Sequence, residues 1–288
     1  MIIIDISNIA YASMFQHIAM QKNAPINEDL LRAIVLNSVR SNVKKFKQVY
    51  ANSPESIGVV LAFDSSTYWR RDLFPHYKAR RAAARVSSPF DWGSIHSHMN
   101  TIMSELFLYT PYTTVKVDGA EADDVIGTLV PHFAAKEPVL IISGDKDFPQ
   151  LQSDANVRQY APVLKKFIVE SLPAMQLKQL IIRGDKDDGI PNILSPDDVF
   201  VSGGRQRPIS EKKLVQWLMQ PPEAFCDTTM LRNYHRNQQL IDLKQIPLIL
   251  RTSILAAHTE APKVTRTQFL QYLVKKQLSQ LISVIDEF

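Results

Sequence analysis

The stretch Val139-Leu140-Ile141-Ile142-Ser143-Gly144-Asp145-Lys146-Asp147-Phe148 begins as an apolar run and ends in a turn that carries two aspartates. Two earlier segments, Ile2 to Ile6 and Gly58 to Phe63, are apolar and rich in β-branched residues in the same way. Short runs of this kind are typical of strands that are buried on both faces of a parallel sheet. We therefore expect the three segments to lie in one sheet.

The residues between these runs have helical spacing. Asn27 is placed to cap a helix that continues to about Val49, and a second helix is expected from about Trp92 to Phe107. A short strand, Thr113 to Val117, precedes a third helix from about Ala120 toward Lys136. Strand, helix and strand in succession imply right-handed parallel crossovers. We expect an α/β fold with a central, mostly parallel sheet flanked by helices.

The pattern changes after the second aspartate of the opening stretch. A hairpin is expected across Val157 to Val169, and the chain from about Leu172 onward is mainly helical. We expect an α/β domain over residues 1–183 and a helical subdomain over residues 184–288. The Gly203-Gly204 loop is the best internal linker.

Composition narrows the classes of protein. With 288 residues, 45% of them hydrophobic, the chain can bury a large core. A single cysteine, Cys226, excludes an internal disulfide framework and structural zinc or iron–sulfur sites, and it suits a reducing cytosol. The apolar start is too short for a signal peptide, and no segment is long enough to span a bilayer. We expect a soluble, intracellular protein that does not bind membranes.

The formal net charge of +4 is unevenly distributed. The segment from Arg70 to Arg85 holds six basic residues and one acidic residue, while the remaining carboxylates occur in short clusters. A protein that holds a polyanion against a metal site needs both a basic strip and acidic pockets.

Aspartates stand at the ends of all three apolar runs. In an open parallel sheet, ligands bind outside the carboxyl ends of the strands, so these side chains are expected to gather at one edge. A cluster that opens a helix and two acids from the helical region can join them. The carboxylates concerned are Asp5, Asp64, Glu121, Asp123, Asp124, Asp145, Asp147, Asp185 and Asp188.

So many carboxylates cannot be buried together uncompensated, because they repel one another or take up protons. Oxygen ligands without suitable cysteine or histidine favour Mg²⁺, or Mn²⁺ in its place, over Zn²⁺. Two such ions roughly 4 Å apart can activate water and stabilise the leaving oxygen. A lone aspartate is a helix cap or a solvated residue roughly nine times in ten. The recurrence of acids favours metal-assisted phosphodiester hydrolysis instead.

The acidic segments also have the order and spacing of a known family. The chain resembles the flap endonuclease and 5′-to-3′ exonuclease superfamily nearly from end to end, and most of all the branch formed by T-even bacteriophage ribonucleases H. The matching segments are Ile4-Asp5-Ile6-Ser7, Tyr68-Trp69-Arg70-Arg71-Asp72, Tyr77-Lys78, Glu121-Ala122-Asp123-Asp124, Ile141 to Phe148, Gly184-Asp185-Lys186-Asp187-Asp188 and Glu287-Phe288. The resemblance implies a PIN-like 5′ nuclease with a helical arch at about residues 70–90.

The resemblance implies roles for the acids. The first metal site corresponds to Asp64, Glu121, Asp123 and Asp145, and the second to Asp147, Asp185 and Asp188. Asp5 is implied to lie close by and to hold a metal-bound water, as both a ligand and a catalytic residue. Asp124 matches the last acid of its cluster and is expected to act through water, whereas Asp187 is expected to face solvent.

The basic strip resembles the helical arch of the family. Lys78 and Arg81 are implied to contact the scissile phosphate and to stabilise charge in the transition state. Further residues of the strip are implied to bind the nucleic acid, namely Arg70, Arg71, Tyr77, Arg80 and Arg85. A charge run without context is a solvated helix about four times in five. Its place between two acidic motifs favours the arch, and Ala82 to Ala84 favours helix there.

An aromatic residue and one departure from the family complete the pattern. Tyr11 stands where relatives place an aromatic that stacks on a base, an interaction worth roughly 1 to 3 kcal/mol; packing in the first helix is an equally good interpretation. Leu194-Ser195-Pro196-Asp197-Asp198 replaces the glycine-rich hairpin with which cellular relatives grip duplex phosphates. Arg205 and Arg207 are candidates for substitute contacts.

The residues and the resemblance together predict a monomeric nuclease that acts on DNA and RNA–DNA hybrids with 5′ ends or flaps and removes RNA primers in replication. We expect it in the cytoplasm, that of the host if a phage encodes it, with a single-stranded DNA-binding protein or a sliding clamp as partner. One alternative is a small metal-dependent ribonuclease, against which the arch argues. Another is a branched-DNA-binding module without catalysis, against which the complete set of acids argues.

Overall fold

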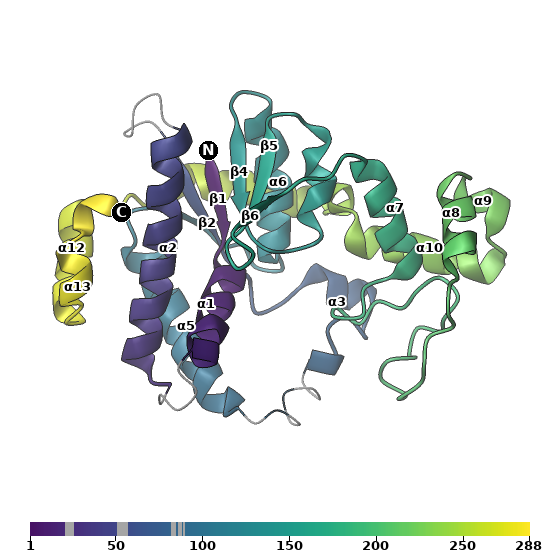
Figure 1. Cartoon of the computed structure of the whole chain (residues 1–288), viewed down its shortest axis with the longest axis horizontal. Helices are drawn as coiled ribbons and strands as arrows, with labels where there is room; N and C mark the ends of the chain where they lie inside the picture. Colours follow the sequence, from purple (N-terminus) through teal and green to yellow (C-terminus); the bar gives the residue numbers. More distant parts are fainter. Residues whose placement is uncertain (21–25, 51–56, 82–84, 86–87, 89) are drawn as a thin grey trace.

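The computed structural model describes residues 1–20, 26–50, 57–81, 85, 88 and 90–288 (Figure 1). Its centre is a six-stranded sheet in the order β3-β2-β1-β4-β5-β6. The strands are β1 (Ile2–Asp5), β2 (Val59–Ala62), β3 (Thr113–Val115), β4 (Val139–Ile142), β5 (Val157–Ala161) and β6 (Lys166–Ile168). All neighbours are parallel except β5 and β6. The predicted sheet and its closing hairpin are therefore confirmed.

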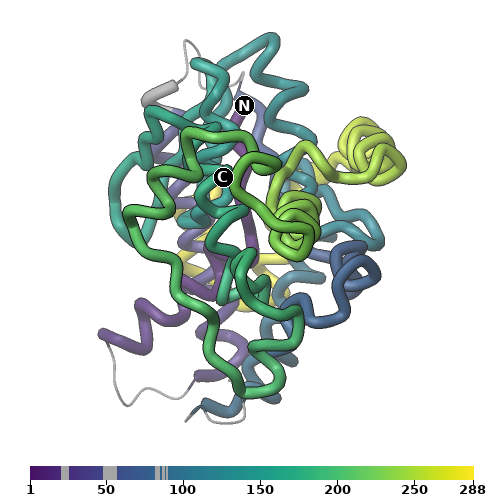
Figure 2. The backbone as a smooth tube through the Cα atoms, turned by 90° about the vertical axis from the view of Figure 1, so that its right-hand side faces the viewer, coloured from purple at the N-terminus to yellow at the C-terminus, as the bar shows by residue number. Residues whose placement is uncertain are grey.

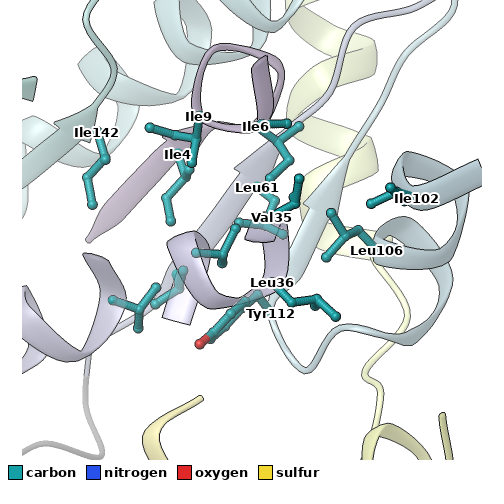
Figure 3. Packing of buried hydrophobic residues seen from close by; sticks show 14 of the residues in the cluster. Ile4, Ile6, Ile9, Val35, Leu36, Leu61, Ile102, Leu106, Tyr112 and Ile142 are labelled. Atoms are coloured by element: carbon teal, nitrogen blue, oxygen red, sulfur yellow. The ribbon is translucent and has the colours of Figure 1, made fainter. Parts of the chain in front are cut away.

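Different helices cover the two faces of the sheet, because successive side chains of a strand point in opposite directions. Ile2 and Ile4 lie on the face covered by α1 (Ile6–Met20), α2 (Glu28–Tyr50) and α5 (Trp92–Tyr109). Figure 3 shows Ile4 in this packing. Ile3 lies on the face covered by α6 (Ala122–Ala134) and α11 (Leu248–Glu260). These isoleucines are at most 1% exposed, and burying each contributes roughly 1.5–3 kcal/mol.

Polar residues set the beginnings of two helices. The N–H of Leu30 donates to Asn27 Oδ1 at 2.9 Å, as predicted for the start of α2. The helix α6 begins with a reciprocal capping box between Glu121 and Asp124. Ahead of it, β3 ends two residues earlier than predicted, because the N–H of Ala120 donates to the carbonyl of Val117 in a turn. This turn brings the acidic start of α6 to the carboxyl edge of the sheet.

Apart from α11, which covers a face of the sheet, the helices after β6 lie at two ends of the molecule. The helices α7 (Pro173–Arg183), α8 (Glu211–Leu218), α9 (Pro222–Phe225) and α10 (Thr228–Ile241) form the end at the right of Figure 1, which faces the viewer in Figure 2. The helices α12 (Arg266–Lys275) and α13 (Ser279–Ile282) lie at the other end, packed on the core of α2 and α5. Shorter elements are α3 (Trp69–Leu73), η2 (Phe148–Ser153), η3 (Leu243–Gln245) and η4 (Ile285–Glu287).

The chain beyond residue 183 does not pack as one separate unit. Leu243 and Ile254 join the core under α6, and Phe269 joins the core between α2 and α5. The Gly203-Gly204 loop is exposed and lies between α7 and α8. The packing therefore shows no boundary at residue 183, and the division of the chain there stays a prediction. Within the described residues, every helix is too short or too polar to cross a bilayer.

Candidate active site at the carboxyl edge of the sheet

Acids from three neighbouring strand ends act on one another at the carboxyl edge. Asp5 ends β1, while Asp64 and Asp145 follow β2 and β4, the strands on either side of β1. Asp5 is buried, and its burial together with the charges of Asp64 and then Asp145 raises its pKa to about 7. Hydrogen bonds from the N–H of Asn8 and the hydroxyl of Ser143 oppose this rise. The three acids therefore occupy one electrostatic environment.

Two further buried acids extend this environment. Burial raises the pKa of Asp123 well above its usual range, and the charges of Asp145 and Asp5 raise it further. Burial likewise raises the pKa of Asp147, with added repulsion from Asp145 and Asp185. Asp145 is thus common to two sets of acids, one on the α6 side and one on the side of the turn that carries Asp185.

Hydrogen bonds hold the turn after β4 in place. The hydroxyl of Ser143 donates to Asp5 Oδ2 at 3.0 Å and accepts the N–H of Asp145 at 3.1 Å. From β5, Gln159 Nε2 donates to the carbonyl oxygens of Ser143 and Asp145, at 3.0 and 2.6 Å. Asn8 Oδ1 accepts the N–H that follows Ser143 at 3.1 Å. These contacts fix where two strand-end carboxylates stand.

Asn8, Ser143 and Gln159 were not identified as site residues from the sequence. Ser143 and Asn8 stand within or beside the acidic motifs, so their position was a usable signal. Gln159 is fully buried in the strand Val157–Ala161, and a buried amide needs partners. Nothing in the sequence indicates that those partners are carbonyls of the turn after β4.

Cationic and phenolic side chains from residues 77–81 reach into the acids. Lys78 Nζ donates to Glu121 Oε1 at 2.5 Å, and Arg81 Nη2 donates to Asp188 Oδ1 at 2.5 Å. The hydroxyl of Tyr77 lies 3.0 Å from both Glu121 Oε2 and Asp188 Oδ2. Burial alone lowers the pKa of Lys78, but the charges of Asp188 and Glu121 outweigh it and raise the pKa overall. Lys78 is therefore held in its charged form.

Backbone contacts join this cationic segment to the turn that carries Asp185 and Asp188. The N–H of Lys78 donates to the carbonyl of Asp188 at 2.7 Å, and Lys78 has a left-handed φ of 57°. Gly189 has a φ of 74°, and a Cβ there would lie 2.9 Å from the carbonyl oxygen of His76. Only glycine permits this approach without displacement. The turn and the cationic segment are thus fixed against each other.

Arg70 and Tyr77 are buried against acids of the site. Arg70 is 3% exposed, and its Nη1 lies 2.9 Å from Glu121 Oε2 and 2.8 Å from Asp124 Oδ1. Its Nε donates to the carbonyl of Leu240 at 2.8 Å. Tyr77 is 2% exposed and also faces Glu121. In this structure both side chains contact buried Glu121, and their contact with nucleic acid stays a prediction.

Asp124 also has structural partners. Its carboxylate accepts the indole N–H of Trp69 at 3.1 Å and the N–H of Glu121 at 2.9 Å. A water-mediated metal contact for Asp124 stays a prediction. The stacking of Tyr11 on a base also stays a prediction. The hydroxyl of Tyr11 lies 3.0 Å from His96 Nδ1. The remaining predicted contacts of the nucleic acid are exposed or half-buried, namely Arg71, Arg80, Arg85, Arg205 and Arg207.

Comparison with known proteins identifies the fold and the family. Residues 1–180 match the family model described as "5'-3' exonuclease, N-terminal resolvase-like domain". The chain belongs to this family. Residues 170–288 match a second model, "T4 RNase H, C terminal". The protein is accordingly a hydrolase of the 5′-3′ exonuclease and flap endonuclease family, a 5′-3′ nuclease of the ribonuclease H type.

One relative supports this membership, and two solved structures share the fold. The chain is 30% identical to "Ribonuclease H" of Enterobacteria phage T4 over 99% of its own length and 95% of that protein. The fold is similar to "T5 D15 Protein Co-crystallized with Metal Ions", with a TM-score of 0.61 and 15% identity over 90% of this chain and 97% of that one. A variant of the phage T5 flap endonuclease, solved as a "pseudo-enzyme-product complex with DNA and metal ions", gives a TM-score of 0.59, with 16% identity over 96% and 98% of the two chains.

The acids of this 5′-3′ nuclease suit a hard divalent cation in their chemistry. Among the described residues, no three Asp, Glu, His or Cys side chains form a ready-made metal shell. Cations pair with the acids instead. Lys78 and Arg70 contact Glu121, Arg81 contacts Asp188, and Lys146 contacts Asp185. The donors are all carboxylate oxygens, which favour Mg²⁺ or Mn²⁺. Burial raises the pKa values of Asp5, Asp123 and Asp147, and repulsion from neighbouring acids raises them further.

Proposed function

We propose that the protein is a magnesium-dependent 5′-to-3′ nuclease that hydrolyses phosphodiesters of RNA–DNA hybrids, duplex DNA 5′ ends and 5′ flaps. The observation that carries this proposal is the overlap of two acidic sets on Asp145, with Lys78 and Arg81 paired to the acids Glu121 and Asp188 of these sets. Negative charge in excess attracts divalent cations, and adjacent positive charge attracts a phosphate. Both are needed to hold a polyanion where hydrolysis takes place.

Two groups of carboxylates would hold the metal ions. The first is Asp64, Glu121, Asp123 and Asp145, with Asp5 beside it; the second is Asp147, Asp185 and Asp188. Two Mg²⁺ ions, or Mn²⁺ in their place, would supply activation of water and stabilisation of the leaving oxygen. Ser143 and Gln159 hold the turn that aims Asp145. This support matters because displaced ligands weaken metal sites.

Lys78 and Arg81 would position the scissile phosphate. In the structure both side chains neutralise acids, Glu121 and Asp188. Arrival of cations at these acids would weaken the two ion pairs, because the carboxylates gain stronger partners. The ammonium and guanidinium groups would then be free to donate to phosphate oxygens and to stabilise charge in the transition state.

We propose primer removal in DNA replication as the cellular role. The relative from phage T4 is named a ribonuclease H, and the solved T5 relative is described in complex with DNA and metal ions. We further propose that the protein acts as a monomer in the cytoplasm, that of the host if a phage encodes it. A single-stranded DNA-binding protein or a sliding clamp is the proposed partner.

The test replaces Asp145 with Asn. Cleavage of a 5′-labelled RNA–DNA hybrid and of a 5′ flap in Mg²⁺ is expected to fall at least about 1,000-fold, because metal assistance supplies several kcal/mol of transition-state stabilisation. Binding of the flap is expected to persist. The matched control is Asp187→Asn, since the Asp187 side chain is 85% exposed. Intact substrates after incubation with the wild type would favour the branched-DNA-binding module.

A further inference from the structure

A small basic pocket lies beside the candidate active site, between three segments that are distant in sequence. It is lined by Arg80, by Lys186 and by residues of the loop between α7 and α8, including Phe200, Arg205 and Gln206, and its volume is about 310 Å³. Lys186 directly follows Asp185, and Arg80 directly precedes Arg81. One wall of the pocket is therefore the residue next to Asp185, and another belongs to the cationic segment itself.

The cations of this pocket have no acidic partner in the part of the chain that the structure describes. Within the described residues, Arg80, Lys186 and Arg205 form no ion pair, whereas the neighbouring Arg81 is paired with Asp188. None of the described residues that line the pocket is acidic. Three positive side chains around one cavity repel one another unless an anion enters. The arrangement thus has the charge of a site for a phosphate group.

Neighbouring groups build the walls of the pocket. The guanidinium carbon of Arg80 lies 5.1 Å from the centroid of the Phe200 ring, a cation–π contact that restricts the arginine. Gln206 Oε1 accepts the N–H of Asn192 at 2.6 Å, which fixes that side of the loop. Gly203 turns the loop with a φ of 75°, a conformation in which side chains are strained. The pocket is therefore partly preorganised.

The geometry points to a second phosphate site on the nucleic-acid substrate, held by Arg80, Lys186 and Arg205 and backed by Phe200. It rests on the proposed function, because the substrate strand that reaches the acids presents further phosphates next to them. The ligand is a phosphate oxygen group, either an internal phosphodiester or a terminal 5′ phosphomonoester. Binding of this phosphate fixes which bond of the strand lies at the acids and is cleaved.

The test combines a double variant with altered substrates. Affinity for a 5′-flap DNA is measured by fluorescence anisotropy in chelator, for the wild type and for Lys186→Gln with Arg205→Gln. The double variant is expected to bind at least about tenfold more weakly, and its salt dependence is expected to fall by about two phosphate contacts. A control that removes the same charge at the other end of the molecule, Lys263→Gln with Lys275→Gln, is expected to keep the wild-type response.

The substrate arm identifies the phosphate. Neutral methylphosphonate links are placed one at a time, and in a separate substrate a 5′ hydroxyl replaces the 5′ phosphate. At one position the change is expected to weaken wild-type binding but not binding by the double variant, which measures coupling between that phosphate and the pocket. Coupling at an internal link assigns a phosphodiester, and coupling at the 5′ end assigns a phosphomonoester. Absence of coupling at every position overturns the second site.

This outcome is separable from that of the proposed function. Binding in chelator requires no cleavage, so the coupling is measured whether or not the wild type hydrolyses the substrate. A wild type that cleaves the flap while the double variant keeps full coupling would reject the pocket and leave the nuclease proposal standing. A wild type that fails to cleave would reject the nuclease proposal by itself.

Discussion

Two of the groups of buried charge in the described part of the molecule differ in how their charges are balanced. At the carboxyl edge, burial and like charges raise the pKa values of Asp5, Asp123 and Asp147. Between α2, α5 and α12, burial of Glu105 is outweighed by hydrogen bonds that lower its pKa. Burial is common to both groups, so the direction of the shift separates them.

The carboxylate of Glu105 has donors and cations from the chain itself on both of its oxygens. Arg32 Nε donates to Glu105 Oε2 at 2.6 Å, and the hydroxyl of Tyr272 donates to the same oxygen at 2.9 Å. Lys276 forms an ion pair with the other oxygen. The acids at the carboxyl edge lack such a balance, because Asp123 and Asp147 face mainly other acids. A balanced group stabilises the fold, whereas an unbalanced one requires an outside cation.

The largest expected effect is a dependence of the free energy of unfolding on pH. Its absence would contradict the difference between the two groups. A carboxyl group with a raised pKa stabilises the fold fully below its unfolded pKa of about 4. For Asp5 that stability is lost as the pH rises through about 7. In chelator, the free energy of unfolding is expected to fall on the order of 4 kcal/mol between pH 4 and pH 8. Mg²⁺ is expected to reduce the fall.

Denaturant unfolding at each pH measures this dependence. Glu105 does not add to the pH dependence in this range. Because its pKa is lowered, its contribution to the free energy of unfolding is constant above pH 4 to 5 and is lost only in stronger acid. A free energy that is flat from pH 5 to pH 8 in chelator would show that the edge acids are already balanced.

A second prediction compares a lysine from each group. Lys78→Met is expected to slow single-turnover cleavage about 100-fold, because a preorganised cation at the phosphate is lost. Metal affinity is expected not to fall, because Glu121 loses a competing cation and keeps its carboxylate. Lys276→Met removes the same charge beside Glu105 and is expected to leave the rate unchanged. Rapid-quench kinetics at saturating enzyme measures both. Equal rates for the two variants would remove Lys78 from the mechanism.

The smallest effect is expected for Glu105→Gln. The buried guanidinium of Arg32 would lose a charged acceptor, so the free energy of unfolding is expected to fall by about 2 kcal/mol. Cleavage at temperatures below unfolding is expected to continue at the wild-type rate. The control is Glu287→Gln, whose partners Arg40 and Lys44 are partly exposed, for a change below about 1 kcal/mol. A Glu105→Gln variant as stable as the wild type would contradict the balance described here.

The sequence was sufficient for the sheet and for the positions of its acids. Apolar runs that end in aspartate predict strands and place Asp5, Asp64 and Asp145 at one edge, because side-chain position follows from strand direction alone. The burial of Arg70 was not predictable, because it depends on the approach of Leu240, which lies far away in sequence. The same reason hides Gln159, whose partners belong to another strand end.

The packing of the last third of the chain could not be predicted from the sequence either. Helical periodicity predicts that α11 and α12 exist, but it does not specify which apolar surface covers them. Phe269 and Ile254 pack on opposite faces of the sheet. Such choices depend on shape complementarity between elements, which a single sequence does not display.

The left-handed Lys78 has a consequence for chain length. The N–H of Trp69 is bonded to the carbonyl of Gly119 at 3.0 Å, and the N–H of Lys78 to that of Asp188 at 2.7 Å. The span between these two attachment points has a fixed number of residues. One inserted or deleted residue would rotate the ammonium away from Glu121, even with every side chain retained. Engineering of this region therefore tolerates changes of residue type more readily than changes of loop length.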